Sequence, residues 1–313
     1  MICWSVTDGR AGIEAQALGL AEAIARRLPV GIVAKRIGVR ASHRQLPRVL
    51  WGDPFALLDE GSDALTAPWP DLWIACGRLS VPLSMAVKTR APETFVVQLQ
   101  NPRAPLDAFD LVIPPAHDRL TGDNVFSIIG SPNRLDASKL RAQIVPGLAP
   151  LAVLIGGPNK AFAFDAADAE ALAGKLTALS MPLDVTFSRR TPADAAALLR
   201  EKLGAFAARV FDPSRDAAAS NPYPAMLGTA RAILVTEDSV NMAAEAASTG
   251  RPVYILKLRR KPLAAARKFD AFHADLKAHG AARDFDGEIV AFDYAPLDET
   301  ARAADEVIRR WRR

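Results

Sequence analysis

The chain has 313 residues, a net charge of +4 and 50% hydrophobic residues, a composition that excludes a disordered protein and is sufficient for two folded cores. No apolar run reaches the roughly 18 residues that a membrane-spanning helix needs, and the first residues lack the basic and apolar regions of a signal peptide. Cys3 and Cys76 lie in apolar runs, which suits buried thiols better than a disulfide framework. We therefore expect a cytoplasmic protein.

Short apolar runs alternate with helical patterns from one end of the chain to the other. Helical patterns occupy residues 14–28 and 166–180, for example, and a last helix is expected over 297–311, with an acidic first turn and a basic last turn. The alternation is typical of parallel sheets covered by helices on both faces. Strands are expected at residues 2–6, 30–37, 71–76, 95–99, 110–113 and 125–129, and then at 151–157, 183–188, 208–211, 232–236 and 252–256.

Two such series predict an α/β protein with two Rossmann-like domains that join near residues 145–150. We expect an N-terminal domain over residues 1–147, a C-terminal domain over 148–296 and a C-terminal helix over 297–313. Ligands of open parallel sheets bind beyond the carboxyl ends of the strands. Polar, glycine-rich or basic residues follow the strands in both halves, which predicts a cleft between two facing domains.

Two loops of the second half carry groups suited to phosphate. The segment LIGGPNK combines glycines, which let a backbone approach a ligand, with a lysine. It lacks the spacing of a Walker loop, and a simple tight turn is the alternative. The segment FSRRTP adds two arginines, which can bind a diphosphate through two parallel hydrogen bonds, although one of them could be a surface charge. The candidate residues are Gly156, Gly157, Lys160, Ser188, Arg189, Arg190 and Thr191.

A third loop, TEDSVN, leads from a strand into a helix. Ser239 is placed to cap that helix, and the free amides of a first helical turn bind phosphate well. Glu245 lies about two turns further on, where a carboxylate can accept hydrogen bonds from both hydroxyls of a ribose. The alternative is that Asp238 and Ser239 only cap the helix while Glu245 is solvated. The candidates here are Thr236, Asp238, Ser239, Asn241, Met242 and Glu245.

These motifs occur in an order that resembles the elongated-mitochondria family over nearly the whole chain. That family is named for a plant mitochondrial-fission factor, and its bacterial members are treated as glycosyltransferases of GT-B architecture: two Rossmann-like domains facing a cleft, with a C-terminal helix that returns to the first domain. The motifs that carry the resemblance are WSVTDGRAGIEAQALGLAEA, IACGRLSVP, QNPR, FDLVIPPAHD, VLIGGPNKAF, SRRTP and NPYPAMLGTARAILVTEDSVNMAAEAASTGRPV.

The segment TEDSVNMAAEAASTGRPV is also similar to the donor motif of MurG-like glycosyltransferases, in which a carboxylate binds ribose. The resemblance implies that Glu245 is the ribose ligand and that residues 239–242 flank the diphosphate. It also implies a nucleotide-sugar donor on the C-terminal domain, a cell-envelope glycan or lipid-linked acceptor on the N-terminal domain, and no cofactor or metal. A non-catalytic adaptor that binds a membrane or a protein is the alternative.

Transfer to an acceptor hydroxyl needs a general base, and the first domain offers two candidates. Asp8 follows the first strand in TDGRAG, and His117 with Asp118 follows a later strand in PPAHD. Asp8 has a structural alternative, which is to brace its glycine-rich turn or to cap the next helix. The helix at Ser239 and the basic loops are expected to stabilise the negative charge that develops on the nucleotide diphosphate.

Other chemistries find little support in the sequence. Asp284 and Asp286 have D-x-D spacing, but such spacing arises easily by chance, and no cluster of Cys and His resembles a metal site. No G-x-S-x-G elbow indicates a serine hydrolase. No G-x-G-x-x-G fingerprint indicates a dehydrogenase, and its absence also weakens the case for a nucleotide-sugar epimerase.

Basic residues gather in two places. Residues 257–268 contain six of them in twelve positions, and the chain ends in RRWRR, which includes Trp311. Such clusters suit contact with an anionic membrane face, or they are ordinary solvated helix faces. Nucleic acid is not an expected partner, because no binding motif is present and few aromatics accompany the basic residues.

Overall fold

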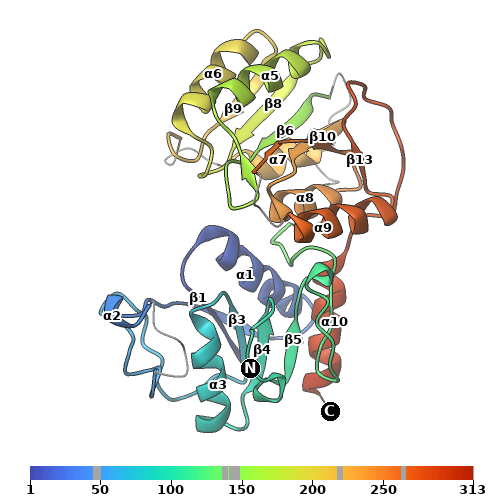
Figure 1. Ribbon diagram of the computed structural model, residues 1–313. Coiled ribbons are helices and arrows are strands. Elements are labelled where there is room, and N and C mark those ends of the chain that lie inside the picture. The colour runs from blue at the N-terminus through green and yellow to red at the C-terminus, as the bar shows by residue number, and fades with distance from the viewer. Residues whose placement is uncertain (45–50, 136–139, 141–148, 217–220, 262–265, 313) are drawn as a thin grey trace. The chain divides into compact units, whose positions relative to one another are not determined.

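The computed structural model describes residues 1–44, 51–135, 140, 149–216, 221–261 and 266–312 and divides the chain into two compact units (Figure 1). Unit 1 comprises Met1–Arg134 and Asp298–Arg313, and unit 2 comprises Leu135–Leu297. The predicted boundary between residues 147 and 148 lies outside the described residues. The last helix belongs to unit 1, so the chain returns to its first unit after completing the second.

Unit 1 contains a five-stranded sheet in the order β2-β1-β3-β4-β5, and every neighbouring pair is parallel. Its strands are β1 Ile2–Thr7, β2 Gly31–Arg36, β3 Leu72–Cys76, β4 Phe95–Leu99 and β5 Leu111–Ile113. Its helices are α1 Ala11–Ala25, α2 Ala41–Arg44, α3 Ser80–Arg90 and α10 Glu299–Trp311, with short 3-10 turns η2 Leu106–Ala108 and η3 Ala116–Asp118.

One strand expected in this half is absent from the sheet. Residues 125–129 form only isolated bridges, Val125 with Val112 and Ile128 with Pro115. The prediction of a regular strand there is wrong because backbone hydrogen bonds join the segment to Val112 and to Pro114–Ala116 at two separate points and do not form a continuous ladder. Ile128 is buried in the core beside β5, and Phe126 packs against the same cluster.

Helices α1 and α10 share a hydrophobic cluster with one face of the unit 1 sheet. Ala303, Ala304 and Val307 of α10 are fully buried, and their small side chains let this helix pack closely against α1. The other face packs against α3 and contains the buried Trp73. The predicted final helix, its acidic first turn and its basic last turn are therefore confirmed. Cys3 and Cys76 are buried free thiols, also as predicted.

Unit 2 contains a six-stranded parallel sheet in the order β13-β11-β10-β6-β8-β9 and a small antiparallel pair, β12 with β7. The strands are β6 Leu151–Ile155, β7 Phe162–Ala163, β8 Leu183–Phe187, β9 Ala207–Phe211, β10 Ala232–Thr236, β11 Val253–Leu256, β12 Arg259–Arg260 and β13 Ala282–Asp284. The helices are α5 Ala166–Thr177, α6 Ala193–Leu203, α7 Tyr223–Thr229, α8 Val240–Ala247 and α9 Arg267–Ala278.

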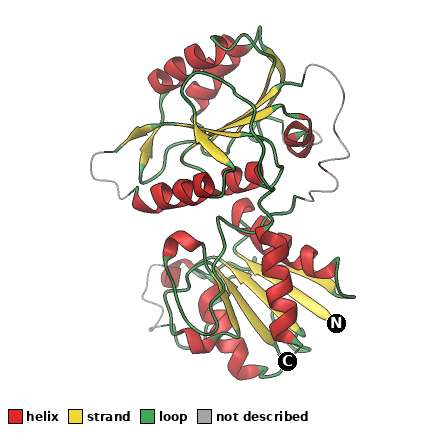
Figure 2. Cartoon of the chain, turned by 90° about the vertical axis from the view of Figure 1, so that its right-hand side faces the viewer, coloured by secondary structure: helices red, strands yellow, loops and turns green. Residues whose placement is uncertain are grey.

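The central strands of unit 2 are buried along their whole length because helices cover them, and the buried Asp184 of β8 is paired with Arg209. Every residue of β6, β8 and β10 is buried, as expected for parallel strands between helical layers. Helices α5 and α6 share one cluster with the sheet, while α8 contacts β10 and β11 and lies beside α9. Figure 2 shows the strands of each unit with their helices beside them.

Strand order decides where the loops of unit 2 meet. Strand β6 lies between β10 and β8, and all three run parallel. Their carboxyl ends therefore share one edge of the sheet, which is where ligands of open α/β sheets bind. Within the part of the chain that the structure describes, no helix combines the length and apolar character needed to cross a membrane.

Candidate functional site

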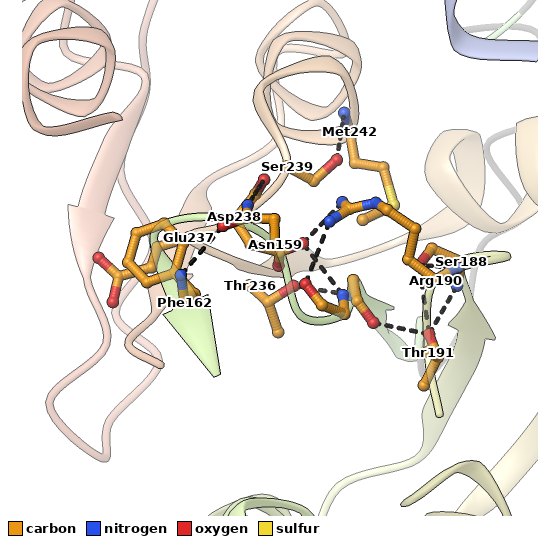
Figure 3. A network of polar contacts seen from close by, with 12 residues as sticks. Asn159, Phe162, Ser188, Arg190, Thr191, Thr236, Glu237, Asp238, Ser239 and Met242 are labelled. Carbon is orange, nitrogen blue, oxygen red and sulfur yellow. Dashed lines mark hydrogen bonds and ion pairs between the residues drawn. The ribbon is translucent and has the colours of Figure 1, made fainter. Parts of the chain in front are cut away.

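The three loops that follow β6, β8 and β10 are joined by hydrogen bonds (Figure 3). The Gly156 amide donates to Thr236 Oγ1 at 2.7 Å, and the Gly157 amide donates to Asp238 Oδ2 at 3.0 Å. From the β8 side, Thr191 Oγ1 donates to the Gly156 carbonyl at 2.6 Å. The structure thus brings together residues that the sequence predicts on three separate loops.

Arg190 ties the same loops together through its guanidinium. Its Nη2 donates to Asp238 Oδ2 at 2.7 Å, and its Nη1 donates to the Gly157 carbonyl at 3.1 Å. The Asp238 side chain is completely buried, and a buried carboxylate needs such a partner. Arg190 and Asp238 are therefore positioning residues in this structure. The neighbouring Arg189 and, on the β6 loop, Lys160 are exposed like Arg190, but neither is in an ion pair within the described chain, so these two cations are available to a ligand.

Both glycines of LIGGPNK are required by contact between loops. A Cβ at Gly156 would lie 2.2 Å from Asp238 Oδ1, and a Cβ at Gly157 would lie 2.2 Å from the Arg190 carbonyl oxygen. Real Cβ atoms essentially never approach other heavy atoms so closely. The missing side chains therefore allow the three loops to pack against one another at the edge of the sheet.

Ser239 caps α8, as predicted. Its hydroxyl accepts a hydrogen bond from the Met242 amide at 3.4 Å. Met242 and Asn241 are half-buried in the first turn, and Ser188 begins the β8 loop, where its amide donates to Thr191 Oγ1 at 3.1 Å. Asn159, which sequence reasoning missed, donates through Nδ2 to the Asp238 carbonyl at 3.3 Å. This amide links the β6 loop to the entrance of α8.

Glu245 lies half-buried on α8 and accepts a hydrogen bond from the Tyr223 hydroxyl at 2.6 Å. Burial raises the pKa of Glu245 to about 7, although the hydrogen bond from Tyr223 opposes the rise. Burial and the neighbouring carboxylate raise the pKa of Tyr223, which keeps its hydroxyl protonated. The alternative of a solvated Glu245 is therefore wrong. Sequence reasoning missed Tyr223, whose one signal is the NPYP segment at the start of α7.

The turn between β10 and α8 is also held by contacts from α9 and from the residues that follow β11. His273 of α9 is buried and lies with Nε2 2.9 Å from the Glu237 carbonyl oxygen. Because that oxygen only accepts, Nε2 carries the proton, and burial lowers the pKa of His273, which favours the neutral ring. The buried Glu237 carboxylate accepts from the Leu258 amide at 2.8 Å. No sequence pattern predicted either of these two contacts with Glu237.

The candidate bases of unit 1 lie at different strand ends. Asp8 follows β1, where Oδ1 accepts from the Arg10 amide at 3.2 Å and Oδ2 from Arg10 Nε at 2.9 Å, so its side chain does brace the TDGR turn. His117 and Asp118 lie in η3, after β5. Strands β3 and β4 separate β1 from β5 in the sheet. The structure therefore does not bring Asp8 together with His117.

At least three of the six basic residues of the segment 257–268 have acidic partners. Arg259 pairs with Asp165 and Asp168, and Arg260 pairs with Asp270. Of the D-x-D pair, Asp284 bonds with Lys257 at 3.0 Å and Lys277 at 2.6 Å. Trp311 is partly buried against the unit 1 core. Among the described residues, no group of three or more His, Cys, Asp or Glu side chains is placed to hold a metal ion.

The fold is that of GT-B glycosyltransferases and of related epimerases. The UDP-GlcNAc 2-epimerase from Methanocaldococcus jannaschii superposes with a TM-score of 0.54 at 9% identity and covers 99% of both chains. The glycotransferase of kitacinnamycin gives a TM-score of 0.50 at 12% identity and covers 99% of this chain and 92% of its own. At such low identities the likeness shows the architecture alone.

The chain belongs to the mitochondrial fission ELM1 family, whose model matches residues 11–311. It is 27% identical to the uncharacterized protein RP120 of Rickettsia prowazekii, with 97% of each chain covered. It is 28% identical to the mitochondrial fission protein ELM1 of Arabidopsis thaliana, over 84% of this chain and 69% of that one. The family resemblance drawn from the sequence motifs is thereby confirmed.

Proposed function

We propose that the protein is a glycosyltransferase that binds a nucleotide-sugar donor on unit 2 and transfers the sugar to a cell-envelope glycan or a lipid-linked acceptor. The observation that carries this proposal is the set of loops after β6, β8 and β10, locked together beside the capped N-terminus of α8. Such an edge offers a helix N-terminus, exposed cations and a carboxylate about two turns along the helix. These three groups suit the phosphates and the ribose of a nucleoside diphosphate.

The site residues divide into two groups by what they contact. We assign phosphate and ribose binding to residues that are exposed or half-buried: Lys160 and Arg189, which are exposed, and Asn241, Met242 and Glu245 of α8, which are half-buried. Glu245 would accept hydrogen bonds from the ribose hydroxyls in its ionised form. The positioning residues, which hold the loops in place, are Gly156, Gly157, Ser188, Arg190, Thr191, Thr236, Asp238 and Ser239.

Charge governs the proposed reaction. Cleaving the glycosidic bond leaves negative charge on the diphosphate, which the α8 dipole, Lys160 and Arg189 stabilise without a metal or another cofactor. The acceptor hydroxyl loses a proton to a base of unit 1. Asp8, whose carboxylate is aligned by Arg10, is the first candidate, and His117 with Asp118 is the second. The reaction takes place in the cytoplasm, with the inner membrane face as a site of contact for a lipid-linked acceptor.

A thermal-shift panel of UDP, TDP, GDP and ADP tests donor binding. UDP heads the panel because a M. jannaschii epimerase of this fold is described in complex with UDP-GlcNAc and UDP. We expect one diphosphate to raise the melting temperature of the wild-type chain and to do so less in Arg189→Ala. Arg231→Ala is the matched control, because this exposed arginine precedes β10 at the opposite edge of the sheet.

The reaction products distinguish a glycosyltransferase from an epimerase and from a non-catalytic protein. Incubation of the protein with the bound nucleotide sugar and cell-envelope acceptors should release the nucleoside diphosphate. Appearance of the C2 epimer in place of free diphosphate would identify an epimerase. A folded protein that no diphosphate stabilises would contradict the proposal and favour a non-catalytic adaptor that binds a membrane or a protein.

A further inference from the structure

Strand β2 leaves one side of its backbone without a neighbouring strand, because it ends the unit 1 sheet. Its other side pairs with β1 in parallel register. The Gly31 amide donates to Met1 O at 3.0 Å and the Ile37 amide to Thr7 O at 2.8 Å. Since main-chain groups alternate in direction along a strand, the odd-numbered residues face β1. The amides and carbonyls of Ile32, Ala34 and Arg36 therefore point outward.

Only part of this outer edge is covered. The Arg36 amide donates to Asp63 Oδ2 at 2.6 Å, and the Asp63 amide donates back to the Arg36 carbonyl at 2.8 Å. Lys35 reaches the same segment through a bond from Nζ to the Ala64 carbonyl at 2.8 Å. Within the described chain, no group bonds to the outward amides and carbonyls of Ile32 and Ala34. The open edge is thus residues 32–34, centred on Val33.

Exposed apolar side chains gather at the same place. Of the large hydrophobic residues that are exposed in the described chain, Met1 (49%), Ile2 (44%) and Val33 (38%) all belong to this corner of unit 1. Ile2 is the register neighbour of Gly31, and Val33 is that of Trp4. Val290, the remaining one, lies in unit 2. An open edge with apolar side chains is a template for pairing with another strand.

We propose that β2 pairs antiparallel with β2 of a second copy of this chain, about a two-fold axis at Val33. Ile32 then lies opposite Ala34 of the second copy, and each such pair exchanges both of its N–H···O bonds. Val33 faces its own counterpart in the close, non-hydrogen-bonded position. Lys35 falls opposite Gly31 of the second copy, so no like charges meet. The two sheets join into one that runs through the dimer.

A second copy fits this edge because the open stretch is self-complementary. Only the register centred on Val33 matches each outward-facing open residue with another open one. Centring the pair on Ala34 would require the main-chain groups of Arg36, which Asp63 already occupies. An isologous contact of this kind closes on itself and gives a dimer rather than a filament. Pairing with an extended peptide from another protein is the competing outcome.

Sedimentation equilibrium of the full chain across the micromolar range tests the proposal. The wild-type chain should approach twice the mass of one chain. Ala34→Pro removes an outward amide and spares the pairing with β1, as proline does on edge strands, and Val33→Lys places two like charges at the axis. Both should weaken the dimer at least tenfold. Val290→Lys, an equal change on the exposed residue of unit 2, should leave it intact.

Cross-linking checks the register. In the proposed pair the two Val33 Cα atoms lie about 4.5 Å apart, within the range that a disulfide spans. Val33→Cys should therefore form a covalent dimer on oxidation, whereas Val290→Cys should not, and the native cysteines are buried and do not compete. A monomeric wild-type chain overturns the proposal, as does a dimer that survives both Ala34→Pro and Val33→Lys. A monomer that captures strand peptides at β2 indicates the competing partner.

Discussion

Glu245 combines burial with a hydrogen bond from Tyr223, and its pKa of about 7 makes nucleotide binding depend on pH. In a protonated carboxyl group one oxygen becomes a donor and the group accepts hydrogen bonds less well, so the ionised form binds the two ribose hydroxyls better. We predict that the dissociation constant for the bound nucleoside diphosphate falls as pH rises from 6 to 8, by up to about tenfold per unit below the pKa. Isothermal titration at several pH values measures this dependence.

Glu245→Gln supplies the control, because its amide does not titrate while the phosphates still do. Its affinity should be weaker and should keep only the pH dependence of the phosphates. The same pKa predicts the stability of the free protein. The folded-state pKa lies above the unfolded value, so the unfolding free energy falls as pH rises from about 4.5 to 7. An identical pH profile in Glu245→Gln would refute the assignment.

Arg189 and Arg190 are adjacent and chemically identical, yet their surroundings separate their roles. Both are exposed, but Arg190 also contacts the buried Asp238, which anchors its guanidinium. We predict that Arg190→Ala lowers the unfolding free energy by about 1–3 kcal/mol, because it leaves a buried carboxylate without its cation. Arg189→Ala should leave stability unchanged and weaken diphosphate binding. Denaturant titration and nucleotide binding distinguish the two, and equal stabilities would contradict the division of roles.

The three loops act as one element because glycine backbone contacts hold them together. A side chain at Gly157 would overlap the Arg190 backbone, so Gly157→Ala should cost about 1–3 kcal/mol through forced displacement and should also weaken nucleotide binding. Gly174→Ala is the matched control. Gly174 lies in α5 with open space around it, and a helical alanine there should stabilise by about 0.5–1 kcal/mol. Thermal unfolding and nucleotide titration of both variants give the comparison.

Local sequence predicted the elements well because period and capping are local properties. The strand before Thr236, the cap at Ser239 and the helix at residues 299–311 all follow from residues within a few positions of one another. The three-residue strand β13 was missed because two of its residues, Arg283 and Asp284, are charged and exposed and give no apolar run. Contacts between elements could not be predicted, because they join residues that are far apart in the sequence. Arg190 meets Asp238 across 48 positions, and no local pattern encodes such a pairing.

At the scale of the whole molecule, ion pairs determine which basic residues remain available to bind an anionic partner. Lys257, Arg259 and Arg260 each pair with carboxylates, and these carboxylates offset part of the positive charge of the basic segment. Contact with an anionic membrane stays a prediction with a weaker electrostatic basis. The cations that remain exposed beside the candidate site, Lys160 and Arg189, lie instead where a diphosphate would bind.

That arrangement predicts turnover without a divalent metal. The α8 terminus and the two exposed cations supply positive charge where the leaving group forms, and Asp284 is bound to Lys257 and Lys277. Transferase activity should therefore persist in excess EDTA. Asp284→Asn tests the same point from the protein side, because removing a metal ligand would abolish a metal-dependent reaction, whereas loss of a lysine pair should leave the rate unchanged. Activity that EDTA removes and manganese or magnesium alone restores would assign the reaction to a metal-dependent class.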